Sequence, residues 1–487
     1  MQNLELLLLL VSSVYIGLNR LINKKFNTFY VIGLLVLVLG IHLVFDGPRW
    51  QMIPAYILWL IAFITGMMQS ERKPATIVLV FKISGLLILL ALSIALPFAL
   101  PVFDLPQSTG PYTAGTMDIN LELDREEVIT TDTTDTRSFM IKVWYPSNEN
   151  GGEMDSYVDP AGRNGFANKY GLPPFFLNYL DKIETHVYRN IKIADETFPV
   201  LIFSHGYHSK ANGYYALLTD LASHGYVVFA INHTYESTGS TFPDGTLKYF
   251  DYEYASQIES GTWETMEPVT EAFQSELSFE ERHPIVRKGL TTYFVGDMVE
   301  RWATDIVDVV SELDAWNSTG FFKGKLDLSN VGVFGHSRGG GAAGASILID
   351  DRIKAAANID GVQWGQIADT VFEKPFLYLS SDWPAEHMNL NQHAYVNKST
   401  SVFYEGMVLQ SGHSNFMDIP YMIPVQGLNE AGDIDPDMAI EITRKVVTSF
   451  FDKHLKSKTI DMDAINSEYG MLKLNTFKGD SIISGRN

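Results

Sequence analysis

The chain of 487 residues contains no cysteine. Disulfide bonds are therefore excluded, and so are metal sites built from thiolates. A chain without disulfides is compatible with a bacterial protein that faces an oxidising exterior. The length exceeds what one ordinary core holds, so we expect at least two structural parts.

Basic residues are also scarce, with 36 Lys and Arg against 57 Asp and Glu and a formal net charge of −21. The deficit is uneven along the chain. Residues 1–101 contain seven Lys or Arg and three Asp or Glu, a local balance of +4, which leaves −25 for the remaining residues. So acidic a part would repel phosphate backbones, which argues against a nucleic-acid partner.

Long apolar runs are confined to the first hundred residues. Because a membrane-spanning helix needs about 20 mostly apolar residues, the fourth run qualifies easily and the second and third qualify with a flanking residue or two. The first is short and contains Glu5. We expect residues 1–103 to form a membrane region with three to four transmembrane helices. The four runs are Leu4–Leu18, Tyr30–Phe45, Met52–Met68 and Ala75–Leu100.

The basic residues of this region predict its orientation. Arg20, Lys24 and Lys25 lie between the first two runs, and Arg72 and Lys73 lie between the last two. Loops rich in Lys and Arg stay in the cytoplasm. We therefore expect a multi-pass protein of a bacterial cell membrane, with the part that follows the fourth run on the extracytoplasmic side.

Residues 104–487 alternate between strand-like and helix-like segments, which predicts a mostly parallel central sheet with helices on both faces. Residues 234–294 interrupt the alternation with weak periodicity, and we expect them to form a lid or cap over the site. The strand-like segments are Phe139–Tyr145, Pro199–Phe203, Tyr226–Ile231, Val331–Phe334, Ala355–Ile359, Pro375–Leu379 and Ser401–Glu405. The helix-like segments are Tyr214–Ser223, Asp297–Trp316 and Met438–His454.

The segment Gly335-His336-Ser337-Arg338-Gly339 joins the strand-like Val331–Phe334 to a run of small residues typical of a closely packed helix. This strand–turn–helix context is that of a nucleophile elbow. The flanking glycines allow a sharp turn. Ser337 then stands at a helix N-terminus, which favours a developing negative charge. We expect Ser337 to be the nucleophile of a hydrolase.

A serine hydroxyl needs a base and an acid that orients the base. In proteins with this elbow the chain order is Ser, then Asp or Glu, then His. Of the later histidines, His387, His393, His413 and His454, we favour His413, because Gly412 lets its loop turn the imidazole inward. Asp360 and Asp382 both follow predicted strands, and either could be the acid.

The oxyanion of an acyl-transfer intermediate needs two backbone N–H donors. The sequence predicts Arg338, which follows the nucleophile, and Tyr207, which follows the early segment Phe203-Ser204-His205-Gly206. We expect His205 to hold that loop in shape. The Arg338 side chain would either meet an anionic substrate group or pair with an acid nearby.

These motifs together resemble the platelet-activating factor acetylhydrolase family, in its plasma or type II branch, over about 300 residues. The similar segments are Val143–Ser147, Phe203–Gly206, Asp220–Tyr226 with Asn232-His233, the GHSRGG elbow, the NIDG segment that ends at Gly361, and His413–Phe416 with Asp418 just beyond. The resemblance implies an α/β-hydrolase fold without a metal or cofactor, and the set Ser337, Asp360 and His413. It also implies hydrolysis of short or oxidised acyl esters of phospholipids.

The chain departs from that family at two places. The residue after the serine is often Phe there and is Arg338 here, and the animal enzymes have no apolar region of this kind. Gly206-Tyr207 and the GHS-x-GGG run are similar to cutinase-like polyester hydrolases, in which the acid sits one strand later, at Asp382 here. The alternatives are thus a general carboxylesterase or polyester-type hydrolase without lipid preference, and, in another class, a non-catalytic membrane receptor on a hydrolase fold.

Overall fold

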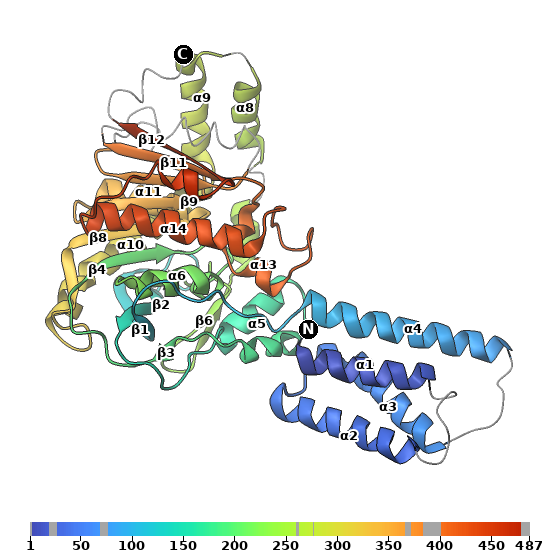
Figure 1. Ribbon diagram of the computed structural model, residues 1–487. Helices are drawn as coiled ribbons and strands as arrows, with labels where there is room; N and C mark the ends of the chain where they lie inside the picture. The colour runs from blue at the N-terminus through green and yellow to red at the C-terminus, as the bar shows by residue number, and fades with distance from the viewer. Residues whose placement is uncertain are drawn as a thin grey trace. The chain divides into compact units, whose positions relative to one another are not determined.

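The computed structural model describes residues 2–18, 27–68, 76–259, 263–275, 277–365, 372–382 and 401–478. The chain divides into two compact units (Figure 1). Unit 1 comprises Met1–Asp104, Phe175–Ile183 and Tyr421–Leu428. Unit 2 comprises Leu105–Pro174, Glu184–Pro420 and Asn429–Asn487.

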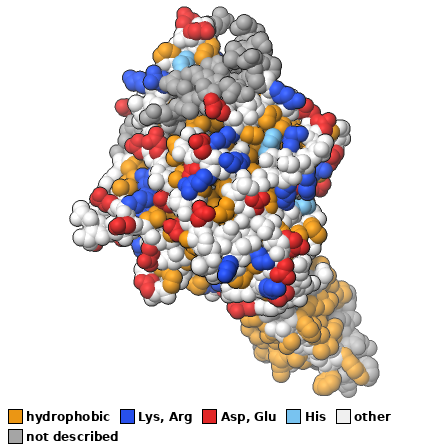
Figure 2. Space-filling model, turned by 90° about the vertical axis from the view of Figure 1, so that its left-hand side faces the viewer, with side chains coloured by type: hydrophobic (Ala, Val, Ile, Leu, Met, Phe, Trp, Pro, Cys, Tyr) orange, Lys and Arg blue, Asp and Glu red, His pale blue; other side chains and the backbone are white. Residues whose placement is uncertain are grey.

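Unit 1 is built on four apolar helices, and most of the exposed large hydrophobic side chains of the described residues lie on them. Figure 2 shows their surface as almost continuous orange, whereas the surface of unit 2 mixes acidic and basic side chains. Two stretches, Trp50–Met68 and Thr76–Ala99, are long and apolar enough to cross a membrane, while Asn3–Leu18 and Phe29–Phe45 are shorter. A region with three to four spans therefore stays a prediction. The helices are α1 (Asn3–Leu18), α2 (Asn27–Phe45), α3 (Ile53–Met68) and α4 (Thr76–Ala99).

Glu5, the acidic residue in the first apolar run, is fully buried and paired. Arg49 donates from Nε to Oε1 at 2.6 Å and from Nη2 to Oε2 at 2.7 Å. The remaining Nη1 donates to the Leu100 carbonyl at 2.8 Å. Because the carboxylate is met by both arms of one guanidinium, its charge does not exclude α1 from an apolar environment.

Unit 2 is built on a ten-stranded sheet with the order β12-β11-β10-β9-β8-β4-β5-β2-β1-β3. The central run from β11 to β5 is parallel, whereas β12, β2 and β1 pair antiparallel with their neighbours on the inner side. The result is a mixed α/β architecture around one large sheet. The strands are β1 (Thr113–Glu126), β2 (Thr136–Ser147), β3 (Tyr188–Arg189), β4 (Phe198–Ser204), β5 (Val227–Asn232), β8 (Leu326–His336), β9 (Ile353–Ile359), β10 (Phe376–Ser380), β11 (Val402–Val408) and β12 (Leu472–Lys478).

Helices cover the parallel strands on both faces (Figure 1). Side chains alternate along each strand, and those of one face join a core cluster with α10 (Val295–Ser318) and α11 (Arg338–Ile349). That cluster includes Val200, Ile202, Val331, Val333, Trp302, Ile306, Ala342 and Ala343. On the other face, Phe334 packs against Phe451 of α14 (Pro436–Leu455), which lies beside α6 (Tyr215–Ser223).

The register brings the carboxyl ends of the parallel strands to one edge. Ser204 at the end of β4 pairs with Gly335 of β8, and His336 pairs with Ile359 at the end of β9. Ser380 ends β10 beside Met407 of β11. The segments that follow these strands therefore emerge side by side, which is where open α/β sheets carry their sites.

Each strand and helix expected from the sequence overlaps an observed element, but the half-exposed strands β1, β3 and β12 at the sides of the sheet were not expected. Residues 234–294 are also more regular than expected. They form a small hairpin of β6 (Gly239–Thr241) and β7 (Leu247–Tyr249), then helices α7 (Tyr252–Glu259), α8 (Trp263–Gln274) and α9 (Phe279–Thr292). Pro268 and Pro284 lie inside α8 and α9 and mask their helical pattern in the sequence.

Candidate active site

Ser337 stands at the sharp turn between β8 and α11. Its φ is 56°, an uncommon value for a residue with a side chain. Its N–H donates to the Ile359 carbonyl at 2.8 Å, which ties the turn to the end of β9. The turn also needs glycine on both sides for space, because a Cβ at Gly335 would lie 2.2 Å from the Gly339 carbonyl oxygen and one at Gly339 would lie 2.2 Å from that of Ser204.

His413 and Asp360 lie together at the same edge of the sheet. His413 Nδ1 is 2.6 Å from Asp360 Oδ2. Ser381 donates to Asp360 Oδ1 from its N–H at 2.7 Å and from its hydroxyl at 2.8 Å. Burial alone would raise the pKa of Asp360, but the hydrogen bonds from His413 and Ser381 outweigh it and hold the pKa below its ordinary value. Asp360 is therefore an ionised carboxylate that holds His413 by Nδ1.

The alternative acid and the other candidate histidines do not take part in this contact. The Asp382 carboxylate accepts the backbone N–H of Gln410 at 2.9 Å, so it braces the loop that leads to His413. His454, near the end of α14, contacts the Tyr404 hydroxyl at 3.1 Å. His387 and His393 lie outside the described residues.

Gly412 serves its loop in another way than expected. Its φ of −110° suits any residue, so no conformational freedom is needed. A Cβ there would lie 2.3 Å from the Glu430 carbonyl oxygen, so the glycine is needed for close approach of two backbone segments. The packing against residues 430–432 fixes the loop that carries His413.

The loop after β4 brings Tyr207 beside the elbow. A Cβ at Gly206 would lie 3.3 Å from the Ser337 Cβ, so the two backbones are in close contact. Among the described residues, no acceptor takes a hydrogen bond from the N–H of Tyr207 or of Arg338. His205 is fully buried and donates from Nδ1 to the Gly206 carbonyl at 2.7 Å. His205 thus shapes the loop, as expected, and is not exposed to substrate.

A buried chain of hydrogen bonds connects this loop to the elbow and to His413. The Gly206 N–H donates to the Tyr214 hydroxyl at 3.0 Å, and that hydroxyl lies 2.9 Å from Nδ1 of His336. His336 Nε2 lies 3.1 Å from the His413 carbonyl oxygen. Burial lowers the pKa of His336 to about 3, so the ring is neutral. Its Nε2–H then donates to His413, and its Nδ1 accepts from Tyr214.

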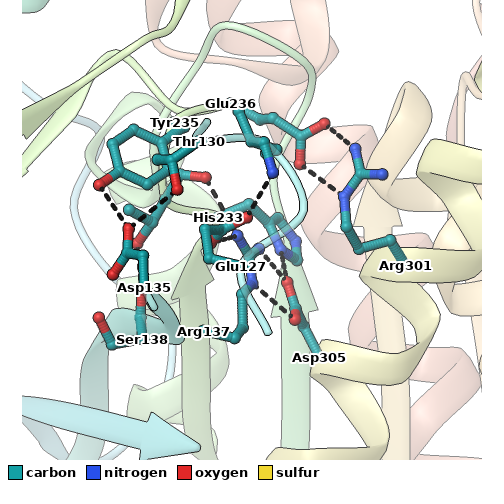
Figure 3. A network of polar contacts seen from close by, with 12 residues as sticks. Glu127, Thr130, Asp135, Arg137, Ser138, His233, Tyr235, Glu236, Arg301 and Asp305 are labelled. Atoms are coloured by element: carbon teal, nitrogen blue, oxygen red, sulfur yellow. Dashed lines mark hydrogen bonds and ion pairs between the residues drawn. The ribbon is translucent and has the colours of Figure 1, made fainter. Parts of the chain in front are cut away.

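A second buried network lies on the other side of the loop (Figure 3). His233 lies 2.8 Å from the Ser204 hydroxyl through Nε2 and 2.7 Å from Asp305 through Nδ1. The Asp305 carboxylate also pairs with the fully buried Arg137. Burial opposes ionisation of Asp305, but Arg137 and His233 outweigh it and lower the pKa of Asp305. Ser204, His233 and Asp305 are hydrogen-bonded in the same sequence of contacts, serine to histidine to acid, as a catalytic set. All three are buried, so their effect is to fix the loop.

His336, Asp360 and His413 offer ligand atoms within 4.8 Å of one another, a grouping found in some metal sites. Their hydrogen bonds compete with that use. Both ring nitrogens of His336 have hydrogen-bond partners, and Asp360 Oδ2 is engaged by His413. The grouping therefore fits a hydrogen-bonded framework better than a set of metal ligands.

No role was predicted from the sequence for five residues that support the site, namely Tyr214, His233, Asp305, His336 and Ser381, although His233 and His336 lie in the motifs cited above. His233 and His336 carry a usable signal, since each is a histidine at the carboxyl end of a buried strand. Tyr214 and Asp305 carry none, because their partners lie 122 and 72 residues away in the chain.

Comparison with known proteins gives the family. A protein-family model described as "Platelet-activating factor acetylhydrolase, isoform II" matches residues 100–472. A platelet-activating factor acetylhydrolase of Cavia porcellus is 25% identical over 379 residues, which cover 72% of this chain and 78% of the relative. A probable 1-alkyl-2-acetylglycerophosphocholine esterase of Arthroderma benhamiae is 22% identical over 282 residues, covering 53% of this chain and 61% of the relative.

A solved structure shares the fold. The ferulic acid esterase of Streptomyces cinnamoneus superposes with a TM-score of 0.59 and 21% sequence identity, over 77% of this chain and 99% of that chain. At 21% sequence identity, this similarity shows that the two proteins share the arrangement of the sheet and its helices.

Proposed function

The chain belongs to the platelet-activating factor acetylhydrolase isoform II family and is an ester hydrolase, and we propose that it releases short acyl groups from phospholipids or other lipid esters through an acyl-enzyme on Ser337. The observation that carries the proposal is the 2.6 Å hydrogen bond between His413 and Asp360 at the sheet edge where the elbow ends. The family match covers residues 100–472 and so includes every residue of this set.

In the proposed mechanism His413 takes the hydroxyl proton of Ser337 as the oxygen attacks the ester carbonyl. The carbonyl oxygen becomes an oxyanion, which the N–H groups of Tyr207 and Arg338 stabilise. Asp360 keeps the Nδ1 proton on His413, so that Nε2 is the basic nitrogen. When the intermediate collapses, His413 returns the proton to the leaving alcohol and Ser337 retains the acyl group. Water, deprotonated by His413, then releases the acid.

The test uses the full chain in detergent and 4-nitrophenyl acetate or butyrate as substrate. Wild type is expected to release nitrophenolate, and Ser337→Ala is expected to lose this activity. Equal turnover by the variant would reject the mechanism. Absence of labelling by a fluorophosphonate probe in the intact protein would favour the alternative of a non-catalytic receptor.

We further propose that unit 1 anchors the enzyme in a membrane and that residues 104–487 form an extracytoplasmic α/β-hydrolase domain. The support is the apolar surface of α1–α4 and the two candidate spans. Anchoring next to a bilayer raises access to lipid esters, which favours a lipid-derived substrate over the polyester or general carboxylesterase alternative. Comparing acetyl phospholipids with soluble esters of the same acyl length separates these readings.

The absence of cysteine gives a clean test of the orientation. Ser467→Cys places a thiol at an exposed position of unit 2, and Ser70→Cys places one between the third and fourth apolar runs of the sequence. In intact cells a membrane-impermeant maleimide is expected to label the first variant and not the second. Labelling of position 70 alone would reverse the orientation.

We also propose that residues 234–294 cover the site as a lid. Their helices α8 and α9 contribute Val269, Val286 and Leu290 to the core cluster of unit 2, so the lid is anchored at its base. A lid that opens at a lipid surface predicts a rise in activity above the critical micelle concentration of the substrate.

A further inference from the structure

The side chain of Arg338 lies beside the nucleophile in an aromatic cradle. Its guanidinium carbon is 3.8 Å from the centre of the Tyr207 ring and 5.3 Å from that of Phe294. Nη1 is 3.4 Å from the sulfur of Met298. Tyr207 comes from the loop after β4, and Phe294 and Met298 come from the start of α10. The cation is thus held by elements that border the proposed oxyanion site.

No carboxylate among the described residues lies within ion-pair distance of Arg338. Other enclosed arginines of unit 2 have strong oxygen acceptors, and Arg444 donates to the backbone carbonyls of Pro106, Gln107 and Ala216. Arg137 pairs with Glu127 and Asp305, and Arg301 pairs with Glu236. An unpaired cation is unexpected in a part of the chain with a net charge of −25, where acids are abundant. Burial lowers the pKa of Arg338, and the more distant charges of Glu259 and Glu236 offset this effect only in part.

The guanidinium has donors to spare. It carries five N–H groups in a planar fork, and the only protein acceptor within reach among the described residues is the weakly accepting sulfur of Met298. The contact with the Tyr207 ring holds the guanidinium without using its N–H groups. Such a fork matches the paired oxygens of a phosphate or a carboxylate.

Space for a substrate adjoins this cation. Ser337, Arg338 and Tyr207 are each partly exposed, whereas the glycines after Arg338 are buried. Tyr207 also lines an open cleft of about 720 Å³, together with Lys169, His208, Phe250 and the α7 residues Tyr252, Ala255, Ser256 and Glu259. Tyr207 contacts both the guanidinium of Arg338 and this cleft, so a substrate at Ser337 that extends along Tyr207 would pass Arg338.

We propose that the Arg338 side chain is a binding site for an anionic group of the substrate, a phosphate or a carboxylate carried close to the ester. The proposal rests on the proposed function, since it concerns the ester cleaved at Ser337. It makes Arg338 a determinant of selectivity: two N–H donors of the fork would bind two oxygens of the anion while Ser337 attacks the neighbouring carbonyl.

The experiment compares pairs of esters that differ in the anion. One pair is 1-butyl-2-acetylglycerol and its 3-phosphate derivative, followed by acetate release. The other is 4-nitrophenyl butyrate and the mono-4-nitrophenyl ester of succinic acid. The full chain in detergent is assayed as wild type, Arg338→Gln and Arg338→Lys. The quantity compared is the ratio of kcat/KM for the anionic ester to kcat/KM for its neutral partner.

A charge-assisted contact of this kind corresponds to a factor of about ten or more in that ratio. We expect the ratio to fall at least tenfold in Arg338→Gln, chiefly through KM, and Arg338→Lys to keep part of it because the charge remains. A fall for the phosphate pair alone identifies a phospholipid headgroup, and a fall for the succinate pair alone identifies an anion on the acyl side.

An unchanged ratio in Arg338→Gln for both pairs would overturn the proposal and leave Arg338 as a packing partner of Tyr207. Fluorophosphonate labelling of each variant shows that Ser337 remains reactive and the fold intact. A wild type that hydrolyses none of the four esters would instead reject the proposed function, so the two failures are distinguishable.

Discussion

Replacing Tyr214 by Phe removes one oxygen atom from the middle of the hydrogen-bond chain that links the oxyanion loop to the elbow. The Tyr214 hydroxyl takes the Gly206 N–H at 3.0 Å and lies 2.9 Å from His336 Nδ1. The tyrosine is only 1% exposed, so water does not replace the hydroxyl. The substitution therefore leaves the Gly206 N–H and His336 Nδ1 buried without the hydroxyl that each contacts.

Each buried polar group left unsatisfied costs about 1–3 kcal/mol, so Tyr214→Phe, which leaves two such groups, is expected to lose about 2–6 kcal/mol of unfolding free energy. Activity should fall as well. Gly206 directly precedes Tyr207, and loss of a properly placed oxyanion donor costs about 100-fold or more in kcat. A loop that is loosened but not removed should lose about tenfold or more in kcat, with little change in KM.

A matched control is Tyr226→Phe. Tyr226 is also fully buried, and its hydroxyl donates to Asp452 at 2.8 Å. It precedes β5 at the opposite edge of the sheet, so its loss should lower stability and leave kcat near the wild-type value. Denaturant unfolding and steady-state hydrolysis of 4-nitrophenyl acetate measure the two effects. Equal kcat in Tyr214→Phe and Tyr226→Phe would refute the link from Tyr214 to the oxyanion loop.

Three further outcomes are expected. Asp360→Asn should lower kcat about 10⁴-fold, because the proton of His413 is then no longer held on Nδ1, whereas Asp382→Asn should change kcat much less. If steady-state kinetics show the larger loss in Asp382→Asn, Asp382 is the acid. Burial raises the pKa of Asp418 to about 7, so the folded state keeps a proton that the unfolded state loses near pH 4, and the free energy of unfolding declines between pH 4 and 7. Asp418→Asn should remove that decline, and its free energy of unfolding at pH 8 should exceed that of wild type by up to about 4 kcal/mol. Urea unfolding at several pH values measures both effects. Arg49→Met leaves the buried Glu5 unpaired and should destabilise unit 1 by about 3–5 kcal/mol, which Glu5→Gln in the same chain should partly restore in thermal unfolding in detergent.

The sequence predicts those parts of the site that depend on local pattern. The elbow at Ser337 is recognisable because a buried strand, a turn with two glycines and a helix of small residues follow one another within a few positions. The histidine loop is recognisable by its place after the last predicted strand. The choice between Asp360 and Asp382 is not local, because both follow strands that end at the same edge; which carboxylate meets His413 depends on the packing of the loops.

The supporting networks could not be predicted for the same reason. Tyr214 reaches His336 across 122 residues, and Arg137 reaches Asp305 across 168. Such contacts depend on strand order and register, which alternation of apolar and polar residues does not encode. The helices of residues 234–294 were missed because Pro268 and Pro284 interrupt the pattern that would reveal them.

Reaction with a fluorophosphonate, followed by mass spectrometry of the digested full chain, decides whether the nucleophile of this enzyme is a serine made reactive by His413. We predict one modified residue, Ser337, with labelling that is lost in Ser337→Ala and strongly slowed in His413→Ala. A modification at any other serine, or equal labelling rates in wild type and His413→Ala, would contradict it.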